Sequence, residues 1–81
     1  MRFSKFNSLT ETQENNLAAF ARGLFLGDYN HFEFLGTRLN FDNCNLIAGF
    51  EIHSKEGSFL LQIKLSEKNK GLKKGFELSE L

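Results

Sequence analysis

The sequence predicts an α+β fold in which one N-terminal helix packs on a four- or five-stranded antiparallel meander sheet. Two observations lead to this prediction. Apolar residues recur every three or four positions as far as Phe25, which is typical of a helix, and alternate with polar residues from His31 onward, which is typical of strands. Three successive turns after His31 place the apolar residues of all the strands on the same face of the sheet. The helix can then pack on this face, so that helix and sheet enclose one core.

The helix is expected between Thr10 and Gly27. The hydroxyl of Thr10, or that of Ser8, can cap its N-terminus, and Gly27 can adopt the left-handed conformation that ends many helices. The apolar stripe that would face the sheet is Leu17, Phe20, Ala21, Leu24 and Phe25. Ahead of the helix, Phe3 and Phe6 are expected to close one end of the core.

Four strands are expected, at residues 31–35, 38–41, 44–53 and 58–66. Gly36 and Thr37 suit a two-residue hairpin turn that starts with glycine. Asp42 and Asn43 suit the next turn because both tolerate positive φ. Residues 54–57 would form a four-residue hairpin loop between the last two strands.

These turns determine which residues pair across the strands. The first turn would place Phe34 opposite Leu39, which the second turn sets beside Leu46. The pairs expected from the third turn are Ile52 with Phe59, Phe50 with Leu61, and Ala48 with Ile63. The inward face of this register is Phe32, Phe34, Leu39, Phe41, Leu46, Ala48, Phe50, Ile52, Phe59, Leu61, Ile63 and Leu65.

The last expected strand, 58–66, reads SFLLQIKLS and carries one charge, which protects a sheet edge poorly. Either residues 76–81 cover it as a fifth strand, instead of forming a helical turn, or a second copy of the chain pairs with it. Because symmetric dimers are the commonest oligomers, we expect a homodimer through this edge or through Leu35, Ile47 and Leu60.

Size and composition indicate a single domain, residues 1–81, because a chain this short cannot bury two cores. Ten acidic residues balance ten basic ones. The single Cys44 cannot form an intramolecular disulfide, which small secreted domains usually need, and the sequence has no signal-peptide or membrane-span pattern. We therefore expect a cytoplasmic protein with no membrane partner.

Motifs of known enzyme chemistry are absent from the sequence, so no catalytic residue, metal or cofactor is predicted. Cys44 falls on the inward face and His31 on the outward face, which argues against a cysteine–histidine pair. The one candidate group for a divalent metal is Asp28, His31 and Asp42, which the first turns would bring together. A surface histidine without a ligand role is commoner, so this group is not predicted to bind a metal.

The outward face offers the best candidate for binding a partner protein. Its residues expected to form a docking surface are Leu35, Arg38, Ile47, Leu60 and Lys64. Without catalytic groups, the chain is interpreted as a small non-enzymatic protein-binding module of the inhibitor or immunity type, which acts by occupying its partner. The asparagine-rich, proline-free composition suggests a phage or mobile element as its source.

An alternative function is association with nucleic acid through the basic segment Lys64–Lys74. Its cations beyond Lys64 are Lys68, Lys70, Lys73 and Lys74. They can attract phosphates by charge alone. Against this reading, the net charge is zero and no strand phenylalanine is expected to point outward to stack on bases, so nucleic acid is not the expected partner.

Overall fold

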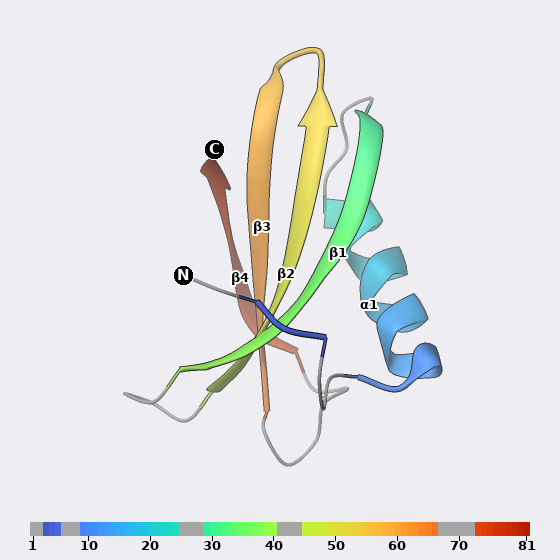
Figure 1. Ribbon diagram of the computed structural model, residues 1–81, viewed down its shortest axis with the longest axis vertical. Coiled ribbons are helices and arrows are strands. Elements are labelled where there is room, and N and C mark those ends of the chain that lie inside the picture. Colours follow the sequence, from blue (N-terminus) through green and yellow to red (C-terminus); the bar gives the residue numbers. More distant parts are fainter. Residues whose placement is uncertain (1–2, 6–8, 25–28, 41–44, 67–72) are drawn as a thin grey trace.

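The computed structural model describes residues 3–5, 9–24, 29–40, 45–66 and 73–81 (Figure 1). The order of elements is α1 (Glu11–Leu24), β1 (Tyr29–Asn40), β2 (Asn45–Ser54), β3 (Gly57–Leu65) and β4 (Lys73–Glu80). The strands pair antiparallel in chain order, β1-β2-β3-β4. This architecture confirms the predicted α+β meander. No helix among the described residues is long and apolar enough to cross a membrane.

The N-terminus of α1 is closed by a reciprocal pair of hydrogen bonds. The backbone N–H of Gln13 donates to Thr10 Oγ1 at 3.2 Å, and the backbone N–H of Thr10 donates to Gln13 Oε1 at 2.9 Å. This capping box satisfies two amides that have no partner within the helix. Thr10 is therefore the cap, as predicted, while the expected C-terminal cap at Gly27 lies outside the described residues.

The predicted hairpin turn at Gly36 and Thr37 is wrong, because β1 runs straight through it. The pairing with β2 shifts by one residue between Phe34 and Gly36, which is a β-bulge, and Gly36 has a φ of 114°. Phe34 consequently pairs with Phe50 of β2 and not with Leu39. The positive φ that favours glycine in a turn here serves a bulge, and the two short strands expected at 31–35 and 38–41 are one strand.

The remaining predicted pairs are confirmed. Leu39 pairs with Leu46, and the expected β2–β3 pairs are Ile52 with Phe59, Phe50 with Leu61, and Ala48 with Ile63. The loop between β2 and β3 is shorter than expected, because Ser54 pairs with Gly57 and only two residues remain in the turn. The predicted turn at Asp42 and Asn43 lies outside the described residues.

The core lies between α1 and one face of the sheet (Figure 1). Its buried residues are Leu17, Ala21, Leu46, Ala48, Phe50, Ile52, Leu61, Ile63 and Leu65. Phe32 and Phe34 are partly buried against it, and Leu39, expected inside, is exposed. Alternate residues of a strand point to the same face of the sheet. The strand residues of the core therefore follow from the alternation of apolar and polar residues in the sequence.

The opposite face of the sheet is partly covered by the N-terminal segment. Ser4 and Thr37 exchange two backbone hydrogen bonds of 2.9 Å each. The ring of Phe3 lies directly over Gly49, where the Cβ of any other residue would come within 2.6 Å of the ring. Phe3 therefore packs on the face away from α1, not at the end of the core, because Gly49 leaves room for the ring there.

Strand β4 settles the two alternatives for the C-terminal residues in favour of a strand. It pairs with β3 from Phe59 opposite Glu80 to Leu65 opposite Lys73. The chain thus covers the edge of β3 with its own C-terminal segment. The expected homodimer contact through residues 58–66 is incorrect for this reason, and β4 becomes the outer strand of the sheet.

Candidate functional site

Two histidines and two glutamates gather on the sheet face opposite α1, and we call them the His–Glu cluster. His31 and Glu33 come from β1, and Glu51 and His53 come from β2. The register places His31 opposite His53 and Glu33 opposite Glu51. Because residues two apart on a strand share a face, all four side chains emerge on the same side of the sheet.

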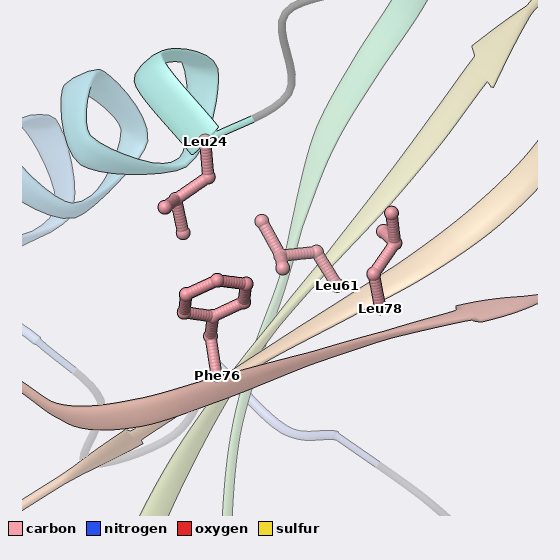
Figure 2. A pocket seen from close by; sticks show the side chains of 4 residues that line it. All are labelled: Leu24, Leu61, Phe76 and Leu78. Atoms are coloured by element: carbon pink, nitrogen blue, oxygen red, sulfur yellow. The ribbon is translucent and has the colours of Figure 1, made fainter.

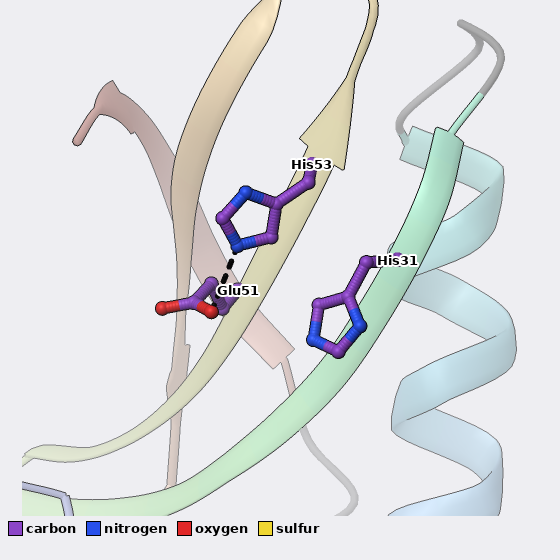
Figure 3. A group of neighbouring side chains, drawn as sticks. All are labelled: His31, Glu51 and His53. Carbon is purple, nitrogen blue, oxygen red and sulfur yellow. Dashed lines mark hydrogen bonds and ion pairs between the residues drawn. The ribbon is translucent and has the colours of Figure 1, made fainter.

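The side chains of the His–Glu cluster form two hydrogen-bonded pairs, one on each strand. His53 Nε2 lies 2.9 Å from Glu51 Oε2, and His31 Nε2 lies 3.2 Å from Glu33 Oε1. The two imidazole centroids are 5.2 Å apart. One ligand atom from each of His31, Glu51 and His53 lies within 4.8 Å of the other two, and Figure 3 shows the three side chains converging.

A serine holds the far side of the His53 ring. His53 Nδ1 lies 2.7 Å from Ser58 Oγ, across the β2–β3 hairpin. With the ring proton on Nε2, His53 donates to Glu51 Oε2 and accepts the Ser58 hydroxyl proton at Nδ1; with the proton on Nδ1, His53 donates to Ser58 Oγ and Nε2 is the nitrogen that can bind a metal. His53 and Glu51 are half-buried, whereas His31 is exposed. The arrangement presents two nitrogen ligands and a carboxylate to solvent, which is a ligand set for a divalent metal.

Sequence reasoning named His31 as a candidate ligand but gave it the wrong neighbour across the strands. The expected hairpin at Gly36 would have brought it to Asp42, whereas the continuous β1 brings it to His53. Asp28, Asp42 and Cys44 lie outside the described residues. The signal available in the sequence was a histidine and a glutamate two residues apart, once in each order, at 31–33 and 51–53.

A second surface feature is apolar and lies on β4, and we call it the β4 patch. It consists of Phe76 and Leu78, which are 53% and 46% exposed, and Leu81, which follows the strand, is 63% exposed. Phe76 and Leu78 pair with Ile63 and Leu61, so they continue the face that forms the core. In Figure 1, α1 lies on the β1 side of the sheet and the C-terminal end of β4 extends beyond the helix. Among the described residues, the apolar side chains of β4 are therefore only partly covered.

The β4 patch includes a small recess that is open to solvent. It is lined by Leu24 at the end of α1, Leu61 of β3, and Phe76 and Leu78 of β4. Figure 2 shows these four side chains surrounding the space, with no polar group among them. Such a recess accommodates an apolar side chain better than a charged one.

The predicted outward docking surface is only partly available. Arg38, Ile47 and Lys64 are neighbours across the strands, as expected, whereas Leu35 lies at the bulge outside this row. Ile47 is 3% exposed. The Arg38 guanidinium donates to Gln62 Oε1 at 3.0 Å and lies 5.8 Å from the Phe3 ring centroid. Leu60 is half-buried. The chain itself thus occupies much of this surface.

The lysines of the predicted basic segment do not share one face where the structure describes them. Lys64 is exposed on the face opposite α1, whereas Lys73 Nζ lies 5.1 Å from the ring centroid of Phe20 on α1. Lys74 is exposed, and Lys68 and Lys70 lie outside the described residues. Among the described residues of this segment, Lys64 and Lys73 therefore do not form one basic surface.

Comparison with known proteins adds no family to these observations. No protein-family model matches the chain, and no curated protein or solved structure matches it either. The two surface features, the β4 patch and the His–Glu cluster, are therefore the basis for assigning a function.

Proposed function

We propose that the chain is a small, non-enzymatic protein-binding module whose binding surface is the β4 patch. The observation that carries the proposal is the exposure of Phe76 and Leu78 on the outer strand β4, where both line a recess with an apolar lining. Isolated exposed apolar residues are ordinary on protein surfaces. A contiguous group with a concave centre is characteristic of an interaction site.

The surroundings of the β4 patch define what kind of partner it suits. The strand carries charges of both signs, at Lys73, Lys74, Glu77 and Glu80. An apolar centre with a charged rim is the usual organisation of a protein interface. The partner is therefore a protein that inserts an apolar side chain into the recess and pairs its own polar groups with this rim. As the outer strand, β4 also has main-chain groups facing away from β3 that an extended segment can pair with.

An inhibitor or immunity-type role follows as the finer part of this proposal. A domain of 81 residues without a catalytic motif acts on a partner most simply by covering part of its surface. A cytoplasmic partner is proposed because the sequence has one cysteine and no disulfide framework. The asparagine-rich, proline-free composition supports a phage or mobile element as the source.

The double substitution Phe76→Ser with Leu78→Ser is expected to abolish partner binding. Removing an aromatic anchor from the centre of an interface typically weakens binding by roughly 30-fold or more. The measurement is co-purification of the tagged chain from its native host, followed by mass spectrometry of stoichiometric partners. Because both side chains are about half exposed, the variant should keep its fold, which circular dichroism checks.

The matched control is Leu39→Ser, which removes an exposed apolar side chain from β1, away from β4. The control is expected to retain the partner that the double variant loses. Recovery of no stoichiometric partner by the unsubstituted chain, or equal recovery by both variants, would count against the β4 patch. Light scattering across a concentration series identifies the remaining alternative, since a dimeric mass lost in the double variant would make the occupant a second copy of the chain.

A further inference from the structure

The His–Glu cluster points to a second site of a different chemistry. We propose that it binds one Zn²⁺ ion per chain, with His31, Glu51 and His53 as the protein ligands and solvent at the fourth position. The ion would connect β1 to β2 on the face opposite the core. This site is separate from the β4 patch, because β1 and β4 form opposite edges of the sheet.

The positions of the ligand atoms are close to those that a zinc ion requires. In tetrahedral coordination with bonds of about 2.0–2.2 Å, neighbouring ligand atoms lie about 3.3–3.5 Å apart. His53 Nε2 and Glu51 Oε2 are already 2.9 Å apart, and all three ligand atoms lie within 4.8 Å of one another. The proposed site requires the exposed His31 side chain to rotate toward the other two ligands, while the paired strands hold the backbone in place.

The hydrogen bond to Ser58 prepares His53 for this role. A histidine ligand normally donates its second ring nitrogen proton to a fixed acceptor, which sets the tautomer and the ring orientation. Here Ser58 Oγ, 2.7 Å from Nδ1, is that acceptor. In the proposed complex the ring proton lies on Nδ1, which donates to Ser58 Oγ, and the ion lies between Nε2 and the Glu51 carboxylate.

The charges around the cluster suit a dication. Glu51 supplies one negative charge to the ion, and Glu33, 3.2 Å from His31 Nε2, supplies a second at the edge of the site. Among the described residues, no Lys or Arg side chain is hydrogen-bonded or ion-paired to these four. Two imidazoles with one carboxylate favour zinc over Mg²⁺ or Ca²⁺, which prefer all-oxygen sites.

Zinc titration of the untagged, EDTA-treated chain tests the proposal, because a histidine tag would itself bind the ion. Isothermal calorimetry and elemental analysis are expected to give one Zn²⁺ per chain. His31→Ala, Glu51→Gln and His53→Ala should each weaken binding by more than tenfold, since each removes a direct ligand. Glu56→Gln, in the adjacent β2–β3 turn, is the matched control and should leave the affinity unchanged.

Ser58→Ala tests the orientation of His53 separately from direct ligation. Loss of such a supporting hydrogen bond typically weakens metal binding by about 10–100-fold. Ser79→Ala on β4 is the corresponding control and should bind zinc like the unsubstituted chain. Tetrahedral Co²⁺ substituted at the site provides a spectroscopic signature, because its visible absorption is expected to change in Ser58→Ala and to stay the same in Ser79→Ala.

Thermal unfolding gives a readout that does not depend on calorimetry. Free zinc at about 100 times its Kd should raise the unfolding midpoint of the chain by roughly 10 °C, and should raise that of His31→Ala far less. His31 is exposed, so its substitution leaves the metal-free fold intact. Absence of zinc binding at ~100 µM, equal affinity in the ligand variants, or one ion shared between two chains would each overturn the proposal.

Discussion

Replacing Phe50 with Ala is expected to lower the free energy of unfolding by about 3–5 kcal/mol. Phe50 lies at the centre of β2 and is fully buried. Its ring centroid is 5.3 Å from that of Phe32 and 5.3 Å from that of Phe34, so it joins β1 to the core. The truncation leaves a cavity that paired strands on both sides prevent from collapsing.

A loss of this size is a large part of the roughly 5–15 kcal/mol that stabilises a typical domain. Urea denaturation followed by circular dichroism measures it, and Phe76→Ala is the control with the same change of side chain. Because Phe76 is 53% exposed, its truncation is expected to cost about 1 kcal/mol. Similar losses in the two variants would contradict the placement of the core between α1 and the sheet.

Replacing Gly36 with Ala is expected to destabilise the chain by about 2–3 kcal/mol. Gly36 has a φ of 114°, which residues with a Cβ rarely adopt. A Cβ there would also lie 2.5 Å from the backbone oxygen of Ser4. The substitution therefore strains the bulge of β1 and pushes away the N-terminal segment that is hydrogen-bonded to Thr37.

Gly23→Ala provides a control of opposite sign. Gly23 lies inside α1, and apart from the neighbouring helix backbone no atom of the described residues lies within 4 Å of the added methyl group, so alanine should stabilise the helix by roughly 0.5–1 kcal/mol. Both variants are compared by urea denaturation. Hydrogen exchange of the Thr37 amide adds a local readout, since only Gly36→Ala should reduce its protection. Equal stability of Gly36→Ala and the unsubstituted chain would show that residues 36 and 37 do not have the bulged conformation.

Much of the fold was accessible from the sequence because its signals are local. Thr10 stands just ahead of the apolar stripe, where its hydroxyl can cap a helix, and the structure has the cap at this residue. The short turn after Ser54 sets the β2–β3 register, and a slip by one residue would expose the core side of both strands. These features depend on residues within about one hairpin of each other.

The bulge at Gly36 was not accessible in the same way. A glycine with positive φ fits a hairpin turn and a bulge equally well, and the neighbouring residues do not distinguish them. The choice is made by distant partners. A continuous β1 pairs along the whole of β2, and Thr37 gains two hydrogen bonds from Ser4.

That choice also decides the candidate sites. The sequence itself determined the position of the helix, the alternation of the strands and the inward face of β2 and β3, and it showed the absence of catalytic motifs. These features could be read because the periodicity of apolar residues and the chemistry of turns act over a few residues. The approach of His31 to His53 and the uncovered face of β4 were decided by the tertiary structure. Both depend on which strand lies beside which and on how far α1 reaches across the sheet, and these are settled by the packing of segments far apart in the chain.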